Sequence, residues 1–150
     1  MKKTLVILLT LIMIVSSVFC LPVSALSANK VTETTIEYLE NGDYIETVLT
    51  YEDSLTRATK SGSKTKNYKN SSGTTLWSVT VTCTFSYTGS LSSCTSVSHS
   101  AKSYSSSWTI KSVSSDRAGN TGTAYATAAY SSKNYSMSVS LSCSTYGELS

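Results

Sequence analysis

The sequence predicts an all-β fold, an antiparallel two-sheet sandwich of about eight strands that is immunoglobulin-like in outline. Three observations predict it. Apolar residues alternate with Ser or Thr over long runs, turn signals recur roughly every ten residues, and no segment carries a helical apolar stripe. More than a third of the residues are Ser or Thr, and only 14% are charged. This composition excludes a coiled coil, while ten Tyr and two Trp argue against a disordered chain.

The segment 77–87 is the clearest strand. Apolar residues alternate there with Ser or Thr from Trp77 through Phe85 to Tyr87. Successive side chains of a strand point to opposite faces, so this segment has one apolar and one hydroxylated face, whereas a helix would scatter the same residues around its axis. The segment 135–143 repeats the pattern, and 124–130 and 108–110 show it more weakly. This parity assigns Trp77, Phe85, Tyr87 and Trp108 to the core.

Turn residues separate these runs. Asn41-Gly42 lies between 36–40 and 44–51 and indicates a hairpin, because a type I′ turn needs positive φ at both central positions. A two-residue turn would place Glu37 opposite Glu46, and such a like-charge pair is unfavourable. A longer loop that includes Asp43 is therefore an equally good prediction. Further turn signals occur at 70–73, 88–90, 119–120 and 131–134.

The first 25 residues have the pattern of a secretory signal peptide. Two lysines precede an apolar run, and small residues suit cleavage after Ala25, with Ala28 as a second choice. The apolar run is shorter than the ~20 residues of a usual membrane span. We therefore expect a secreted, extracellular product with no stable membrane span after cleavage. Removing Lys2 and Lys3 cancels most of the formal charge of +3, and a nearly neutral chain is not expected to bind nucleic acid.

Charge divides the mature chain into two parts. The segment 29–56 carries seven acids and one lysine, and 57–111 carries seven bases and no acid. We predict an acidic N-terminal hairpin or arm at 29–58 and a β-sandwich domain at 59–150. The acidic part could be a detachable pro-segment released near Arg57. The favoured interpretation is that acidic and basic strands lie side by side and neutralise each other.

Three cysteines remain after signal cleavage, and secretion would allow one disulfide. Cys83 lies on an apolar strand face, where a free cysteine behaves as a small hydrophobe. Cys94 lies in a polar run, and Cys143 ends a core-facing strand. We predict a Cys94–Cys143 bridge. Cys83–Cys94 stays open as an alternative because a turn near Gly89 would place these two across a hairpin, and Cys83–Cys143 or no bridge is also compatible.

Residues for catalysis or for metal and cofactor binding are not evident. His99 is the only histidine, and strand parity places it on the face opposite Cys94. The serines lack a Gly-x-Ser-x-Gly elbow, and one histidine with three separated cysteines does not make a zinc site. Most acids are expected on a solvated face rather than as a catalytic pair. We therefore predict no catalytic, cofactor or metal site and a non-enzymatic protein.

Aromatic residues are the remaining candidates for binding, because Tyr and Trp stack on sugars and anchor interfaces. Tyr125 lies on the face opposite the alanines of 124–128, and three more tyrosines lie near turns. The possible binding aromatics are Tyr68, Tyr104, Tyr125 and Tyr146. Scattered surface tyrosines are also common without any function.

The runs 38–44, 57–60, 76–79, 85–89 and 94–96, together with the ending Cys143…Gly147-x-Leu149-Ser150, resemble small secreted Ser/Thr-rich β proteins of Gram-positive, clostridia-like bacteria. These proteins have no assigned function. The resemblance spans most of the mature chain. It implies cysteines at the positions of Cys94 and Cys143, often with a small residue in place of Cys83. It implies no ligand or catalytic residue.

Three functional hypotheses follow. The leading one is a secreted, non-enzymatic β-sandwich that binds an extracellular or envelope partner through a face or an edge strand. The second is a bacteriocin-like effector matured by cleavage near Arg57. The third is a hydrolase that uses N-terminal carboxylates such as Glu37 and Glu46, and it ranks last because no activity can be named for it.

Overall fold

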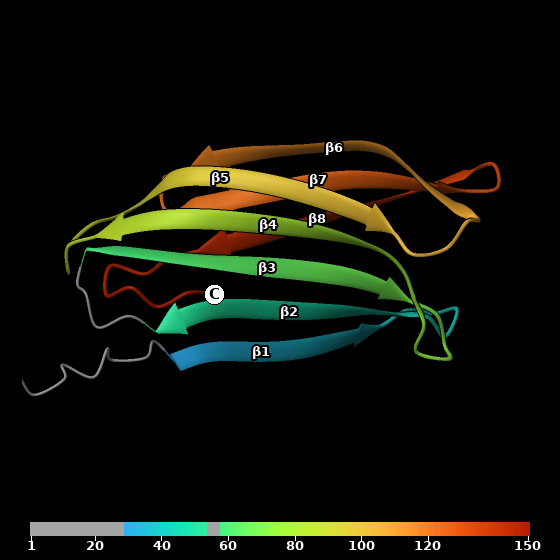
Figure 1. Ribbon diagram of the computed structural model, residues 1–150, viewed down its shortest axis with the longest axis horizontal. Coiled ribbons are helices and arrows are strands. Elements are labelled where there is room, and N and C mark those ends of the chain that lie inside the picture. The colour runs from blue at the N-terminus through green and yellow to red at the C-terminus, as the bar shows by residue number, and fades with distance from the viewer. Residues whose placement is uncertain (1–28, 54–57) are drawn as a thin grey trace, which may run out of the picture.

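The computed structural model describes residues 29–53 and 58–150, most of which lie in eight strands (Figure 1). The strands are β1 (Asn29–Tyr38), β2 (Tyr44–Asp53), β3 (Thr59–Lys69), β4 (Thr75–Tyr87), β5 (Ser92–Ser103), β6 (Trp108–Ala118), β7 (Thr121–Tyr130) and β8 (Lys133–Ser142). The predicted signal peptide and Arg57 lie outside the described residues.

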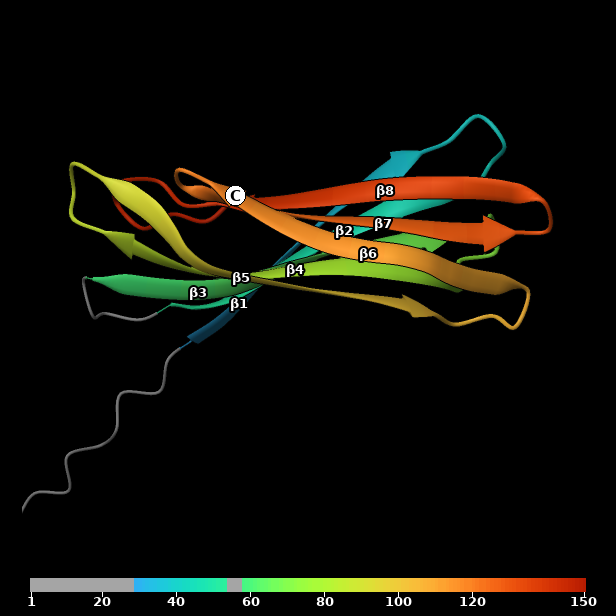
Figure 2. The same ribbon diagram turned by 90° about the horizontal axis from the view of Figure 1, so that it is seen from above.

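The strands form two antiparallel sheets, one in the order β1-β2-β3-β4-β5 and the other in the order β6-β7-β8. The chain passes from one sheet to the other between β5 and β6, and Figure 2 shows the sheets as two layers. The predicted all-β sandwich is therefore confirmed. Within each sheet the strands pair in sequence order, so the likeness to an immunoglobulin domain lies in the two-layer outline and not in a Greek-key order.

The first hairpin has the longer of the two predicted loops. Tyr38 pairs with Tyr44, and a hydrogen bond from the Leu39 amide to the Asp43 carbonyl closes the loop between them. The Asn41 side chain accepts a hydrogen bond from the Asp43 amide at 3.1 Å, and Gly42 has a φ of +84° that glycine adopts without strain. The loop therefore uses Asn41-Gly42, but not as a two-residue turn.

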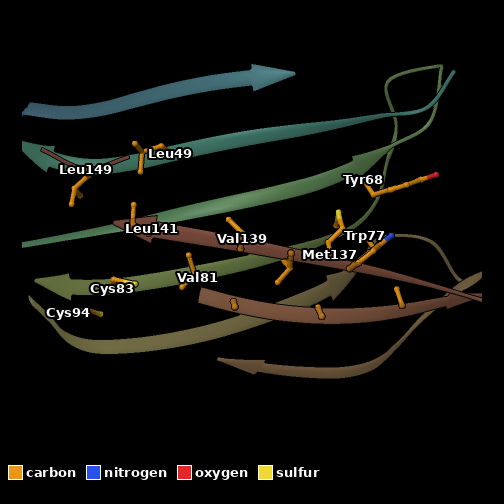
Figure 3. Close-up of a cluster of buried hydrophobic side chains, with 14 of the residues drawn as sticks. Leu49, Tyr68, Trp77, Val81, Cys83, Cys94, Met137, Val139, Leu141 and Leu149 are labelled. Carbon is orange, nitrogen blue, oxygen red and sulfur yellow. The ribbon is translucent and has the colours of Figure 1, made fainter. Parts of the chain in front are cut away.

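The core is formed by the apolar faces that the alternating pattern predicts (Figure 3). Trp77, Val79, Val81 and Phe85 of β4 have no exposed surface, and the parity assignment of this strand is thus confirmed. These four side chains pack against the inward side chains of the second sheet. The inward side chains of β7 are alanines, and those of β8 are larger. Hydroxyl side chains take the opposite faces and pair across strands, as in the 2.8 Å contact between Thr65 and Thr80.

The acidic hairpin extends the first sheet beyond the area that the second sheet covers (Figure 1). Lys69 of β3 lies 2.9 Å from Glu46 of β2, and Lys60 lies 3.4 Å from Asp53. Acidic and basic strands thus lie side by side, as the favoured interpretation predicts. The hairpin is also attached to the core, since Leu49 is buried among the core residues.

The C-terminal segment covers part of this open face. Cys143 and Leu149 pair as an antiparallel bridge, and Leu149 packs against Gly62 of β3, where an added Cβ would lie 2.6 Å from the Leu149 Cδ1 atom. Figure 3 shows Leu149 close to Leu49 of β2. Glycine at position 62 therefore makes room for the side chain that links the tail to the first sheet.

We expect Leu141→Ala to lower the free energy of unfolding by about 2–5 kcal/mol, because Leu141 has no exposed surface and the substitution leaves a cavity in the core. Ser138→Ala, on the exposed face of the same strand, should change it by less than about 0.5 kcal/mol. Urea unfolding of both variants measures the difference. Equal effects would contradict the inward orientation of Leu141.

Candidate aromatic binding site

A hollow of about 420 Å³ opens at the end of the sandwich where β3 ends and β4 begins. The β1–β2 loop, the β5–β6 loop, the start of β6, the end of β7 and the start of β8 complete its walls. Its aromatic lining consists of Tyr68, Trp108, Tyr130 and Tyr135. Its polar lining consists of Asn41, Asp43, Asn70, Ser105 and Ser107. Segments that are far apart in sequence therefore make one polar and aromatic surface.

Trp108 is the centre of the aromatic lining. Its ring centroid lies 4.9 Å from that of Tyr135 and 5.2 Å from that of Tyr130, and the Tyr130 ring is stacked on it at 25°. The Tyr68 ring, on β3 of the first sheet, has its centroid 5.4 Å from that of Trp108. Trp108 is buried, whereas Tyr130 is 46% exposed. The stack therefore presents one accessible ring that is held by a rigid buried one.

The β5–β6 loop positions Trp108. The Trp108 amide donates to the Ser105 carbonyl at 3.0 Å, and the Ser103 hydroxyl donates to the Trp108 carbonyl at 2.9 Å. The Tyr104 amide donates to the Leu76 carbonyl at 2.9 Å, which ties the loop to the start of β4. These bonds hold the short Ser-rich loop against β4 and β6.

Asp43 supplies the charge of the hollow. Its carboxylate accepts hydrogen bonds from the Tyr68 hydroxyl and from the Asn41 side chain, both at 2.9 Å. Burial raises the pKa of Tyr68, with a further contribution from Asp43. Tyr68 therefore keeps its proton at neutral pH and acts as a donor to Asp43. This end also contains the Trp77 indole nitrogen, which is buried without a hydrogen-bond partner among the described residues.

This arrangement suits a ligand with an apolar face and several hydroxyl groups. Aromatic rings provide stacking surface, and carboxylate, amide and hydroxyl groups fix orientation. A second hollow of about 340 Å³ lies at the opposite end, beside Tyr87, Gly89 and Tyr146. Its described lining contains no charged side chain and no cluster of stacked rings. The Trp108 end is thus the better candidate.

The four tyrosines singled out from the sequence do not form one site. Tyr68 lines the hollow but is almost entirely buried. Tyr104 is exposed near the same end, with the Lys102 ammonium 4.8 Å above its ring. Tyr125 lies in a Ser-lined trough on the outer face of the second sheet, and Tyr146 lies at the opposite end.

Sequence reasoning missed the other aromatic members of the hollow. Trp108 lies in the core as predicted, and it also lines the hollow. Tyr130 precedes the 131–134 turn signal, and the rule that selected tyrosines near turns applies to it equally. Tyr135 follows the same turn. A β-hairpin brings such flanking residues together, and this signal would have found the pair.

The predicted Cys94–Cys143 bridge is not formed in this structure, where Cys83, Cys94 and Cys143 are all free and buried. The β6–β7 turn separates the two predicted partners: the Cys94 amide donates to the Gly119 carbonyl, and the Cys143 amide donates to the Asn120 carbonyl. The Cys143 thiol donates to the Ser144 carbonyl at 3.4 Å. Cys94 instead faces Cys83.

A β-bulge explains this orientation. The register between β4 and β5 shifts at Thr84/Phe85, so that Phe85 pairs with Cys94 while Thr84 pairs with Ser96. The extra residue reverses the alternation along β5, and Cys94 points inward in place of Thr95. The sequence-based parity of His99 was therefore wrong, because His99 pairs with the core residue Val81 and shares the inward face with Cys94.

Among the described residues, the hydrogen-bond partner of His99 is Ser115 and not Cys94. Its Nδ1 atom lies 2.7 Å from the Ser115 hydroxyl at the open edge between β5 and β6. Within residues 29–53 and 58–150 no carboxylate is hydrogen-bonded to the ring, so the third member of a catalytic triad is missing there.

The N-terminal carboxylates do not form a pair. Glu37 lies opposite Ile45, so Glu37 and Glu46 lie on different faces of the hairpin. Glu46 accepts hydrogen bonds from Lys69 at 2.9 Å and from Asn67 at 3.0 Å, and the Lys69 hydrogen bond lowers the pKa of Glu46. These contacts are those of a structural ion pair. Glycoside hydrolysis would need two facing carboxyl groups.

Groups of His, Cys, Asp and Glu that could hold a metal ion are not found among the described residues. No helix in the described part of the chain is long and apolar enough to cross a membrane. Comparisons with protein-family models, with curated proteins and with solved structures found no match.

The Glu46–Lys69 pair should make stability depend on pH. Because the folded-state pKa of Glu46 is lowered, its ion pair stabilises the fold above the unfolded-state pKa near 4.5 and is lost as pH falls through the folded value. Between pH 6 and pH 3 the wild type should lose about 0.2–1 kcal/mol more stability than Glu46→Gln. Urea unfolding at several pH values measures this, with Glu33→Gln on exposed β1 as the control. Parallel pH curves for wild type and Glu46→Gln would contradict it.

Proposed function

We propose that this protein is a secreted, non-enzymatic binding module whose aromatic hollow binds a sugar ring of an extracellular or cell-envelope glycan. The observation that carries the proposal is the half-exposed Tyr130 ring stacked on buried Trp108 beside the carboxylate of Asp43. The signal-peptide pattern of residues 1–25 supports a place outside the cell.

A sugar ring matches both parts of this surface. Its C–H face is apolar and stacks on an aromatic ring, while its hydroxyl groups hydrogen-bond to carboxylate and amide groups. Asn41 and Tyr68 hold the Asp43 carboxylate in place, so little conformational entropy is lost when a ligand binds to it. The negative charge favours neutral or amino sugars over acidic ones.

The geometry supports binding rather than catalysis. Asp43 is the only carboxylate that lines the hollow within the described residues. A glycosidase needs a second carboxyl group across the scissile bond. The hydrolase hypothesis based on Glu37 and Glu46 is weakened further by their position on opposite faces of the hairpin.

Maturation near Arg57 fits this site poorly. Such a cut would separate β1, β2 and their loop from the sandwich, and with them Asp43 and the core residue Leu49. It would also leave β3 as an unpaired edge strand, which is a template for aggregation. The bacteriocin-like effector is therefore the weaker alternative.

Tyr130→Ala should weaken glycan binding at least about fivefold, because it removes the accessible stacking ring. Tyr125→Ala is a matched control, since Tyr125 lies on the same strand and is also 46% exposed. Calorimetry and tryptophan fluorescence would be measured with a soluble neutral glucan, N-acetylglucosamine oligomers and polygalacturonate. Equal loss in both variants, tighter binding of the acidic polymer, or no binding of any of the three would overturn the proposal.

Intact mass spectrometry of culture supernatant tests the maturation. We expect the secreted chain to begin at residue 26 or 29 and to retain β1 and β2. A product that begins near residue 58 would favour the effector and remove Asp43 from the mature protein. Retention of the leader in a cell-bound form would instead contradict secretion.

A further inference from the structure

Cys83 of β4 and Cys94 of β5 lie side by side in the core (Figure 3), against Gly122 near the start of β7. Both are at most 5% exposed. Cys83 pairs with Val97 and Cys94 pairs with Phe85, so the two cysteines are diagonal neighbours on the inward face of adjacent antiparallel strands. The β-bulge at Thr84/Phe85 creates this neighbour relation, because it turns Cys94 inward.

Gly122 of β7 provides the space for both sulfur atoms. A Cβ atom at position 122 would lie 2.4 Å from the Cys83 sulfur and 3.4 Å from the Cys94 sulfur. The two sulfurs therefore lie against the same point of the β7 backbone. Any larger residue there would displace them, whereas glycine leaves a pocket in which they can approach each other.

We infer that Cys83 and Cys94 form the disulfide of the oxidised protein and that Cys143 remains a free thiol. The inference is independent of the proposed glycan site. It replaces the Cys94–Cys143 pairing expected from the sequence, which the β6–β7 turn obstructs.

The oxidant is a small-molecule or protein disulfide, R–S–S–R. The Cys94 sulfur attacks one of its sulfur atoms, a mixed disulfide forms, and one R–SH leaves with the proton of Cys94. The Cys83 sulfur then attacks the Cys94 sulfur, and the second R–SH leaves with the proton of Cys83. The two cysteines are oxidised by two electrons, and R–S–S–R is reduced to two thiols.

Cys94 is the first nucleophile in this sequence of steps. Burial is the main cause that raises the pKa of Cys83 to about 12, and the neighbouring Cys94 thiol is the second cause. A thiol that resists ionisation attacks a disulfide slowly. Cys94 lies on β5, the edge strand of its sheet, whereas Cys83 lies on interior strand β4. Transient opening of the edge strand during folding would expose Cys94 first.

The test uses the mature chain refolded in a glutathione buffer that contains the oxidised form, followed by alkylation of free thiols and chymotryptic digestion without reduction. Chymotrypsin cleaves after Phe85 and Tyr87, which lie between the two cysteines. We expect a linked pair of peptides with Cys83 and Cys94, lighter than the reduced pair by two hydrogen masses, and alkylation at Cys143 alone. A linked peptide that contains Cys143, or three alkylated cysteines, would overturn the inference.

Thermal melting gives a second readout. The oxidised wild type should melt about 5–10 °C above the same sample treated with dithiothreitol, because the bridge closes a short loop across the β4–β5 hairpin. Cys143→Ser should keep this difference, while Cys83→Ser and Cys94→Ser should each abolish it. Loss of the difference in Cys143→Ser, or its persistence in Cys83→Ser, would contradict the assignment.

Discussion

The inward row of β4 is the feature on which the rest of the structure depends. Trp77, Val79, Val81 and Phe85 are fully buried, and they can be so only if a second sheet covers them. The covering sheet consists of β6, β7 and β8. It approaches closely because β7 presents alanines and Gly122 to the core.

Since the second sheet covers only part of the first, the two ends of the sandwich differ in character. At one end, Trp108 of β6 is surrounded by aromatic residues near the ends of β3, β4, β7 and β8. The β1–β2 loop, which extends from the uncovered part of the first sheet, places Asp43 beside them. The acidic hairpin is thus more than a charged edge. It contributes the one carboxylate of the candidate site within the described residues.

At the other end of the sandwich, a single inserted residue in β5 decides which side chains face the core. The bulge opposite Thr84 and Phe85 reverses the alternation along the rest of the strand. It turns Cys94 toward Cys83 and moves His99 to the inward face, where it contacts Ser115. In a Ser/Thr-rich strand, alternation of side chains is a weak signal because the two faces resemble each other. Such a strand tolerates a shift without loss of apolar burial.

The sequence by itself determined the all-β class, the strands, the inward row of β4 and the position of most turns, because these depend on neighbours within one strand or one hairpin. It also placed the acidic and basic strands side by side, as the contact between Glu46 and Lys69 shows. Only the tertiary structure decided which rings surround Trp108, which cysteines are neighbours and where Asp43 lies. These depend on register shifts and on the approach of two sheets, and both are set by packing between residues far apart in the chain.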